Sequence, residues 1–388
     1  MRTSLALAVA GAAIASAYGT PKPSYGNEYS PVPASCSRLP PHQRLINQTY
    51  VLPDPFHFIN GHPVRNEADW YCRAAQIREL FQKYELGYKP AKPPIFSSTY
   101  SSNTLNIHAG LSKSKTINFS IPIKPANVTS NGASPAVIAY NGVSVPIPAQ
   151  AAIIVLNVDQ IALQDNSSSR GIGLFYDLYG NDTTTAGALM AWAWAVSRIL
   201  DALEAHPEAG INPRKVAVTG CSRNGKGAMV AGAFDERIAL TIPQESGSGG
   251  DACWRTSRDM LVNQNLATQT AQEIVTENVW FSESFDYFAR DNYTVGLLPV
   301  DHHELAGLVA PRGLYSTNNA LGVADHQGFS QDGPHNHCSF PADQEAEIAA
   351  FYNRFLLDEA VSTDVFRTVG NWTFDPKWTP WAVPDLVA

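Results

Sequence analysis

The hydrophobic pattern of the chain consists of short apolar runs that alternate with longer mixed segments. Residues 136–140, 152–158, 215–219 and 238–242 are almost continuously apolar or β-branched. Such runs are typical of strands that are buried on both faces. Residues 184–206 carry large apolar side chains without an internal proline, and residues 345–357 show a second helical pattern. Strands that alternate with helices predict an α/β fold with a doubly wound, mostly parallel sheet and helices on both faces.

The first residues have the pattern of a secretory signal peptide. A positive start, an apolar stretch and the small residues Ala15-Ser16-Ala17 occupy positions 1–17, and we expect this segment to be removed. Residues 18–35 are rich in Pro, Ser and Tyr and predict a short lead-in, followed by a single domain over 36–388. The apolar region 136–157 predicts no membrane span because polar residues and prolines interrupt it, at Asn141, Pro146, Pro148 and Gln150.

The overall charge excludes some classes of partner. The 388 residues include 27 Lys and Arg against 35 Asp and Glu, which gives a formal net charge of −8. This balance offers no basic surface, so we expect neither nucleic acid nor a membrane as partner. Apolar residues make up 44% of the chain and charged residues 16%, a composition that allows a large core and excludes disorder and a coiled coil.

Secretion changes how the asparagines and cysteines are interpreted. Seven Asn-x-Ser/Thr sequons are candidate glycosylation sites on the surface: Asn47, Asn118, Asn127, Asn166, Asn181, Asn292 and Asn371. Five cysteines in an oxidising compartment should be mostly paired, and their odd number leaves one over. They are Cys36, Cys72, Cys221, Cys253 and Cys338.

Ser222 lies in the segment Gly220 to Gly225, between a predicted strand and a helix of small residues. This is the strand–turn–helix context in which hydrolases expose a nucleophilic serine. The segment departs from the G-x-S-x-G pattern because Asn224 occupies the place of the second glycine. Asn tolerates positive φ better than most residues, so the turn stays feasible. A purely structural turn of Gly and Ser is the alternative interpretation.

An acid and two histidines complete the candidate chemistry. Glu245 follows the next predicted strand, and the carboxyl ends of neighbouring parallel strands converge on one crevice. Glu245 should therefore stand beside Ser222. A late loop carries His335 and His337, and Asp332 in that loop is a rival for the role of the acid. The order of serine, acid and histidine along the chain is that of the α/β-hydrolases.

A metal site is the competing interpretation of the histidines. His335-x-His337 and the run Asp301-His302-His303-Glu304 contain residue types that bind zinc. Neither has the spacing of a helical H-E-x-x-H site or of a zinc finger. We therefore expect no metal and no other cofactor.

Longer motifs around these residues resemble the fungal glucuronoyl esterases of carbohydrate esterase family 15. The matching segments are 220–228, 246–250, 252–255, 299–303, 310–314 and 337–338, and the resemblance extends from about Cys36 to Phe355. It implies an α/β-hydrolase-like fold in a secreted serine esterase. Such an enzyme hydrolyses the ester between (4-O-methyl-)glucuronic acid of glucuronoxylan and lignin alcohols through an acyl-enzyme.

The resemblance also implies a role for individual residues. Ser222 would be the nucleophile, His337 its base and Glu245 the group that orients His337. This assignment agrees with the need of a neutral serine for an oriented base. Further implied roles are an oxyanion contact from Arg223, sugar-hydroxyl contacts from Lys226, Gln269 and Glu277, and the disulfides Cys36–Cys72 and Cys221–Cys338.

One segment of the family pattern is missing after Asn319. The family carries there a Trp that contacts the uronate, a cysteine and a helix, whereas Ala320 follows at once in this chain. The missing cysteine would be the partner of Cys253. Residues 314–317 and 327–330 predict successive parallel strands, which need a crossover of about a dozen residues. Either the sheet edge is altered, or a skipped exon or a misdrawn gene model produced the gap.

Two other functions fit the same pattern. One is a general carboxylesterase or serine peptidase with the same triad, and the other is a catalytically impaired relative that only binds glucuronoxylan. Turnover of methyl glucuronate esters, compared with short p-nitrophenyl esters, separates these possibilities. We expect a monomer whose partner is the ester that links glucuronoxylan to lignin.

Overall fold

A computed structural model of the chain describes residues 48–127, 132–180, 186–319, 330–332, 335–365 and 376–386, together with Cys36 and Leu39. The expected signal peptide and lead-in, residues 1–35, lie outside the described residues.

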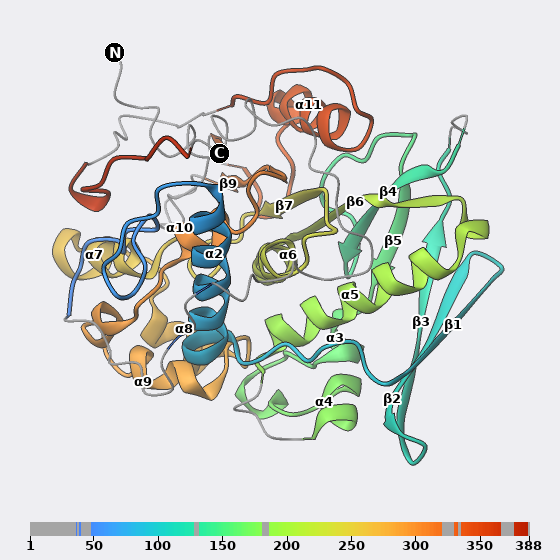
Figure 1. The fold of residues 1–388 in the computed structure, drawn as a ribbon, viewed down its shortest axis with the longest axis horizontal. Helices are drawn as coiled ribbons and strands as arrows, with labels where there is room; N and C mark the ends of the chain where they lie inside the picture. The colour runs from blue at the N-terminus through green and yellow to red at the C-terminus, as the bar shows by residue number, and fades with distance from the viewer. Residues whose placement is uncertain are drawn as a thin grey trace.

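A ten-stranded sheet runs through the molecule in the order β1-β2-β3-β5-β4-β6-β7-β9-β10, and β8 pairs with β7 (Figure 1). Strands β4 to β10 pair in parallel, whereas β1, β2 and β3 form an antiparallel meander that joins β5. This arrangement confirms the predicted α/β fold with a mostly parallel sheet. The strands are β1 (Ile95–Ser101), β2 (Thr104–Ser112), β3 (Lys115–Lys124), β4 (Ser134–Tyr140), β5 (Ala152–Leu156), β6 (Ile211–Cys221), β7 (Leu240–Gln244), β8 (Gly313–Leu314), β9 (Thr317–Asn319) and β10 (Ser330–Asp332).

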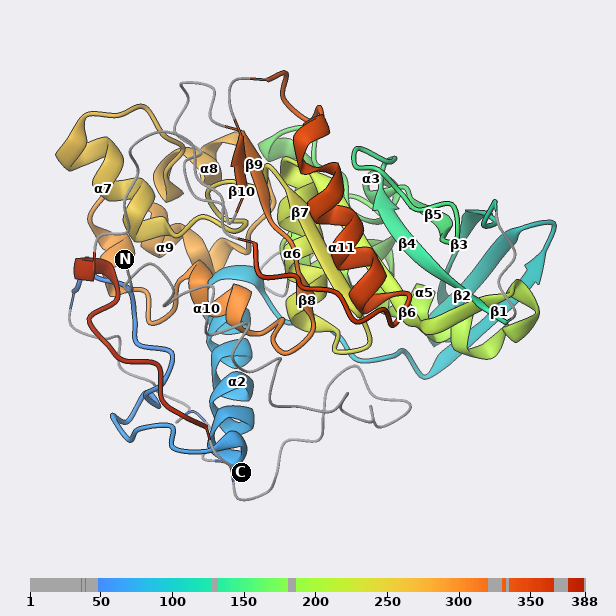
Figure 2. The same cartoon turned by 90° about the horizontal axis from the view of Figure 1, so that it is seen from above.

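Helices cover both faces of the sheet. Successive residues of a strand point to opposite faces. Ile138 and Val218 accordingly belong to the larger core with α5 and α6, whereas Val137 and Ala217 belong to a smaller core beneath α11. Figure 2 shows α11 on one side of β7 and α6 on the other. The α-helices are α2 (Glu67–Phe81), α3 (Val158–Ile161), α4 (Leu174–Tyr179), α5 (Ala188–Ala205), α6 (Arg223–Phe234), α7 (Trp254–Gln264), α8 (Ala271–Glu277), α9 (Asp286–Ala289), α10 (His302–Gly307) and α11 (Glu345–Phe355).

The predicted apolar runs correspond to β4, β5, β6 and β7, and the two predicted helices correspond to α5 and α11. Strand β5 ends earlier than predicted because the Asn157 side chain accepts a hydrogen bond from Gln160 N and caps the short helix α3. Helix α5 begins directly after Gly187, where a Cβ would lie 2.3 Å from the Trp280 carbonyl oxygen. Within the described ranges, no helix combines the length and the apolar character needed to cross a bilayer.

The family segment that the sequence predicts to be missing after Asn319 would fall at the edge of the sheet. Strands β9 and β10 pair in parallel, with Thr317 opposite Ser330. The connecting residues 320–329 lie outside the described residues, and parallel neighbours ordinarily need a crossover of about a dozen residues. The altered edge therefore stays a prediction.

Two disulfides are present, Cys36–Cys72 and Cys221–Cys338. These are the pairs that the family resemblance implied. Cys253 is the remaining cysteine, and its thiol is buried. The expectation of two bridges and one cysteine left over is confirmed.

Candidate active site

Ser222 occupies a sharp turn between β6 and α6. Strand β6 ends at Cys221 and helix α6 begins at Arg223. Ser222 itself has φ 59° and ψ −125°, a backbone conformation that L-residues rarely adopt and that is characteristic of functional turns. The Ser222 amide donates to the Gln244 carbonyl at 2.9 Å and its carbonyl accepts from Lys226 N at 3.0 Å. The strained serine is thus fixed on both sides, as in a nucleophile elbow.

Two glycines make this turn possible. A Cβ at Gly220 would lie 2.5 Å from the Asn224 carbonyl oxygen, and a Cβ at Gly225 would lie 2.6 Å from the Gln244 carbonyl oxygen. Gly220 therefore lets the helix pass over the strand, and Gly225 lets it approach β7. The second glycine is needed where α6 meets β7, which explains why it stands one residue later than in G-x-S-x-G.

Glu245 follows the last residue of β7 and is 3% exposed. Its backbone has φ 45°, and its amide donates to the Thr317 carbonyl at 2.6 Å. The carboxylate accepts a short hydrogen bond from His337 Nδ1. It also accepts from the Cys338 amide at 3.1 Å. Because an ionised carboxylate only accepts, this contact assigns the proton to Nδ1 and leaves Nε2 as the basic nitrogen.

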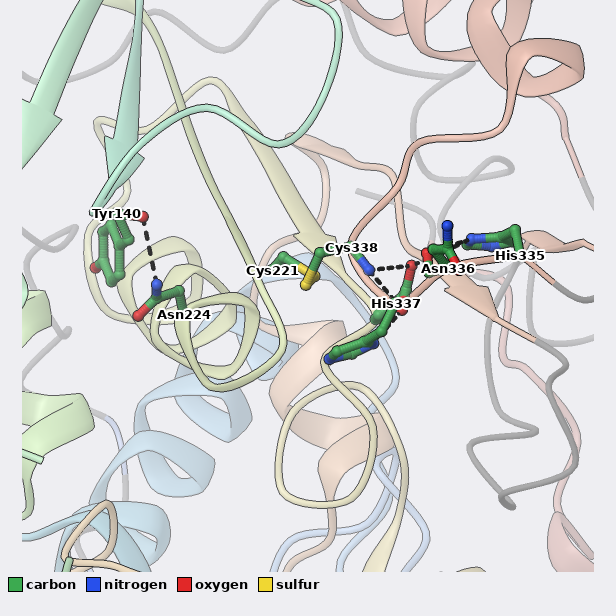
Figure 3. The surroundings of a disulfide bond; sticks show 8 residues. Tyr140, Cys221, Asn224, His335, Asn336, His337 and Cys338 are labelled. Atoms are coloured by element: carbon green, nitrogen blue, oxygen red, sulfur yellow. Dashed lines mark hydrogen bonds and ion pairs between the residues drawn. A yellow bond between two sulfur atoms is a disulfide. The ribbon is translucent and has the colours of Figure 1, made fainter. Parts of the chain in front are cut away.

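The Cys221–Cys338 disulfide brings His337 to the elbow. Cys221 directly precedes Ser222 and Cys338 directly follows His337. The Cα atoms of the two cysteines are 5.7 Å apart, and Figure 3 shows His337 next to the bridge. The His337 side chain is 56% exposed. Ser222 Oγ makes no hydrogen bond within the described residues, so the structure joins Glu245 to His337 but does not join His337 to the serine hydroxyl.

Arg223 and Lys226 project from the first turns of α6 towards one indole. The Trp280 ring centroid lies 5.5 Å from Arg223 Cζ and 5.9 Å from Lys226 Nζ, within the range of cation–π contacts. Lys226 is buried, and its ammonium donates to the carbonyls of Ser246 and Ser248 at 2.5 and 2.8 Å. The two cations are therefore held on the helix that begins at the nucleophile.

Gln269 and Glu277 also lie together. Gln269 Nε2 donates to Glu277 Oε2 at 2.5 Å, and the Glu277 side chain is exposed. Glu277 ends α8, and the next residue, Asn278, donates from its side chain to the Gln164 carbonyl at 2.6 Å. Gln164 in turn accepts from Arg223. The pair is thus linked to the elbow through Asn278 and Gln164.

The competing metal interpretation finds little support in the geometry. The residues of the run 301–304 bind four different partners: Asp301 pairs with Arg255, His302 with Glu85, His303 with the Pro53 carbonyl and Glu304 with Arg73. Near the elbow, the donor atoms of Cys221, His337 and Cys338 lie within 4.8 Å of one another. Both of those sulfurs are bonded in the disulfide, whereas a cysteine binds metal as a thiolate. His335 Nδ1 lies 3.9 Å from Glu245 Oε1, beside the same carboxylate as His337.

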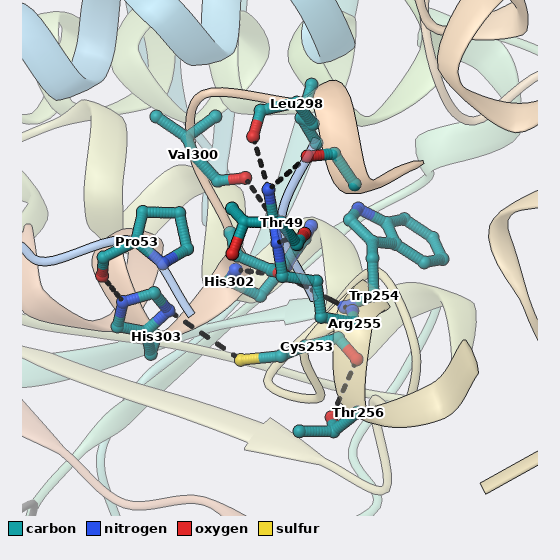
Figure 4. A network of polar contacts seen from close by, with 12 residues as sticks. Thr49, Pro53, Cys253, Trp254, Arg255, Thr256, Leu298, Val300, His302 and His303 are labelled. Atoms are coloured by element: carbon teal, nitrogen blue, oxygen red, sulfur yellow. Dashed lines mark hydrogen bonds and ion pairs between the residues drawn. The ribbon is translucent and has the colours of Figure 1, made fainter. Parts of the chain in front are cut away.

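The run 301–304 instead belongs to a polar network, and Figure 4 shows its members His302 and His303 near Arg255 and Cys253. Burial disfavours charge here, yet Arg255 lowers the pKa of Asp301 and Glu85 raises the pKa of His302. Burial lowers the pKa of His303 to about 4. His303 Nδ1 lies 3.8 Å from Cys253 Sγ, and burial together with Asp301 raises the pKa of that thiol. The network therefore keeps His303 neutral and Cys253 protonated, so this cysteine should be unreactive.

The sequons differ in their surroundings. The side chains of Asn118, Asn127 and Asn166 are exposed, whereas Asn292 is half-buried with an inaccessible Oδ1. Asn47, Asn181 and Asn371 lie outside the described residues. Glycosylation stays a prediction at all seven, and Asn118, Asn127 and Asn166 are the described positions with the most accessible side chains.

Sequence reasoning missed Gln164 and Trp280. Trp280 Nε1 donates to Gln164 Oε1 at 3.0 Å, and both side chains are buried. They lie between the candidate oxyanion group and the candidate sugar-binding pair. Each sits in a mixed segment far from Ser222 in the chain, so no local spacing signals their position.

Comparisons with known proteins agree with this geometry. The profile of the family described as glucuronyl esterase, fungi, matches residues 109–331. The 4-O-methyl-glucuronoyl methylesterase 1 of Wolfiporia cocos is 50% identical over 370 residues, covering 86% of this chain and 89% of that protein. The 4-O-methyl-glucuronoyl methylesterase of Cerrena unicolor is 46% identical over 390 residues, covering 92% of this chain and 81% of that protein.

Solved structures of glucuronoyl esterases are also similar to this chain. A serine-to-alanine mutant of the Sporotrichum thermophile glucuronoyl esterase, in complex with methyl 4-O-methyl-β-D-glucopyranuronate, superposes with a TM-score of 0.84 at 38% identity. The match covers 91% of this chain and 100% of that structure. The glucuronoyl esterase catalytic domain from Hypocrea jecorina superposes with a TM-score of 0.82 at 44% identity. The match covers 90% of this chain and 100% of that structure. The chain therefore belongs to the fungal glucuronoyl esterase family of carboxylic ester hydrolases.

Proposed function

We propose that this chain is a secreted serine esterase that hydrolyses the ester between (4-O-methyl-)glucuronic acid of glucuronoxylan and alcohols of lignin. The observation that carries the proposal is the hydrogen bond between Glu245 and His337, held at the Ser222 elbow by the Cys221–Cys338 bridge. The structure bound to a methyl glucuronate ester belongs to a relative that matches this chain over nearly its whole length. That similarity supports the choice of substrate.

The mechanism follows from the roles of the three side chains. Ser222 Oγ attacks the ester carbonyl carbon while His337 Nε2 takes the hydroxyl proton, and the carbonyl electron pair moves onto its oxygen. Collapse of this intermediate expels the alcohol, which leaves with the proton from His337. Water then attacks the acyl-enzyme with the same base, which releases glucuronate and restores Ser222. Glu245 holds the Nδ1 proton and stabilises the imidazolium formed in each half-reaction.

Arg223 is the proposed oxyanion group. Its backbone N–H makes no hydrogen bond within the described residues and lies at the N-terminus of the twelve-residue helix α6. Such a terminus favours negative charge, and the guanidinium adds a full positive charge beside it. Lys226, Gln269 and Glu277 are proposed to bind hydroxyl groups of the sugar, because all three carry polar groups on segments linked to the elbow.

Export and assembly complete the proposal. We propose that residues 1–17 are a signal peptide, 18–35 a lead-in and 36–388 a single catalytic domain, and that the enzyme is an extracellular monomer that acts without a cofactor. The two disulfides support an oxidising compartment.

The test is hydrolysis of a benzyl ester of glucuronic acid by the chain as given, compared with p-nitrophenyl acetate. The expected result is turnover of the glucuronate ester, and substitution Ser222→Ala should lower it by about 10⁴- to 10⁶-fold without loss of the circular dichroism spectrum. EDTA should leave the rate unchanged. A Ser222→Ala protein that keeps more than a few per cent of the activity would show that the nucleophile is another residue.

Two outcomes would support the alternatives instead. Comparable turnover of short p-nitrophenyl esters would indicate a general carboxylesterase. Binding of glucuronoxylan fragments without turnover would indicate an impaired relative, an outcome compatible with the missing segment after Asn319 and the unbonded Ser222 hydroxyl.

A further inference from the structure

Gln164 is a buried amide whose hydrogen bonds meet at the candidate active site. It follows α3 and is 7% exposed. Its Oε1 accepts from Trp280 Nε1 at 3.0 Å and from Arg223 Nη1 at 3.5 Å, and its Nε2 donates to Asp159 Oδ1 at 3.0 Å. A buried amide with both ends engaged has a fixed orientation, because rotation would leave polar groups unpaired.

Arg223 depends on this amide for its position. Within the part of the chain that the structure describes, Gln164 is the side chain that hydrogen-bonds Arg223, and no carboxylate forms an ion pair with it. The guanidinium also lies over the Trp280 ring, and Gln164 fixes that ring through the indole N–H. Gln164 thus acts on Arg223 directly through Nη1 and indirectly through the indole.

This arrangement suits a group that must receive negative charge. The neutral amide holds the guanidinium without neutralising it, and among the described residues only one of the five guanidinium N–H donors is engaged. A carboxylate in the same place would cancel the charge that stabilises an oxyanion. Donors held in place before the reaction are the ones that stabilise a transition state effectively.

We propose that Gln164 is a positioning residue that, with Trp280, holds the guanidinium of Arg223 ready for the oxyanion formed at Ser222. The inference rests on the proposed esterase function and adds to it a residue outside the triad and its neighbours. The contribution should appear in kcat rather than in KM, because the oxyanion exists in the transition state and not in the bound ester.

The experiment is a double-mutant cycle of Gln164→Met and Arg223→Ala, assayed with a benzyl glucuronate ester. Gln164→Met should lower kcat by about tenfold and leave KM within about twofold, while Arg223→Ala should lower kcat by roughly 10²-fold. Adding Gln164→Met to Arg223→Ala should have almost no further effect, because Gln164 acts through Arg223. Gln160→Met, an exposed side chain of the same segment, is the matched control and should match the unmodified enzyme.

A structural role alone gives a different pattern. Multiplicative losses in the double variant, or an unchanged kcat in Gln164→Met, would overturn the positioning role. If Gln164→Met does not fold, Trp280→Phe replaces it in the cycle, since it removes the N–H that fixes Gln164 and keeps an aromatic face.

A second readout separates this inference from the choice of substrate. The rate at which a fluorophosphonate labels Ser222 depends on the same oxyanion contacts, whether or not glucuronate esters are turned over. If the esters are not hydrolysed but labelling follows the expected non-additive pattern, the substrate proposal fails and the positioning role stands. Absence of labelling in the unmodified protein would overturn both.

Discussion

Removal of the Cys221–Cys338 bridge should damage catalysis as well as stability. The variant is Cys221→Ser/Cys338→Ser, which leaves Cys253 as the single thiol. Its matched control is Cys36→Ser/Cys72→Ser, which removes the bridge between Cys36 and helix α2 and touches none of the candidate catalytic residues.

The losses of stability can be worked out from the two loop lengths. The bridge at the active site joins residues 117 positions apart, and the control bridge joins residues 36 apart. In the chain-entropy description these loops correspond to about 5 and about 4 kcal/mol of folding free energy at 25 °C. The two variants should therefore lose similar stability, which makes any difference in their activity informative.

Only one bridge positions a candidate catalytic group. Without the bond to Cys221, the His337 loop is held at Glu245 by its hydrogen bonds alone. A displacement of about 1 Å at a reacting group can cost on the order of 10²-fold in rate. We expect kcat of the Cys221→Ser/Cys338→Ser protein to fall by about 10- to 100-fold, and kcat of the control variant to stay within about twofold.

The assay combines urea unfolding with kcat for a benzyl glucuronate ester, measured well below both melting temperatures. Equal losses of kcat in the two variants would mean that the effect is global destabilisation. An unchanged kcat in Cys221→Ser/Cys338→Ser, despite lower stability, would show that the Glu245 hydrogen bonds position His337 without the bridge. Either result refutes the reasoning.

Three further predictions concern the acid, the buried histidine and the thiol. Glu245→Gln should lower kcat by orders of magnitude because an amide cannot stabilise the imidazolium, whereas Asp332→Asn should matter much less; the opposite ranking would transfer the acid role to Asp332. The folded-state pKa of His303 is about 4 against an ordinary value of 6.5, so its stabilising contribution is complete above pH 6.5 and is lost as pH falls towards 4. Relative to His303→Gln, the unmodified protein should lose up to about 3 kcal/mol of unfolding free energy between pH 6.5 and pH 4, measured by urea unfolding. The same pH dependence of the unfolding free energy in both proteins would contradict this. Thiol titration of the denatured, non-reduced monomer should find one thiol, from Cys253, and a chain with the family segment restored after Asn319 should show none, together with a higher melting temperature and a lower KM.

The central strands could be predicted because burial on both faces leaves a plain signal. Strand β4 is buried at every position, and its sequence after Ser134 is correspondingly apolar. Strand β3 alternates between buried and exposed positions, so no continuous apolar run marks it or the other strands of the β1–β3 meander. A period-two pattern would have been the signal for those strands.

Helix boundaries depended on contacts that the sequence does not display. The start of α5 at Ala188 follows from the close approach of Gly187 to the Trp280 carbonyl, from a segment more than ninety positions later. The apolar pattern alone could only place the helix within a broader range.

The candidate site was predictable where its residues follow identified strands, and not where they lie in loops. Ser222 and Glu245 follow adjacent parallel strands, and this topology brings them together once the strands are identified. Gln164 and Trp280 approach Arg223 from two separate loops, and a glutamine or a tryptophan in a loop has many other uses. Only the three-dimensional arrangement shows that the two side chains share one hydrogen bond.

The position of Glu245 has a consequence for how this sheet can evolve. The acid is supplied by β7, the nucleophile by β6, and the histidine loop is anchored to both, through the Cys221–Cys338 bridge and through Glu245. Of the edge strands, β9 touches this arrangement through its first residue, because the Glu245 amide donates to the Thr317 carbonyl. The chain after Asn319 can therefore gain or lose length while the reacting groups keep their relative placement. Insertions and deletions between Asn319 and His337 should be tolerated by the triad itself, and their effects should fall on substrate affinity and stability instead.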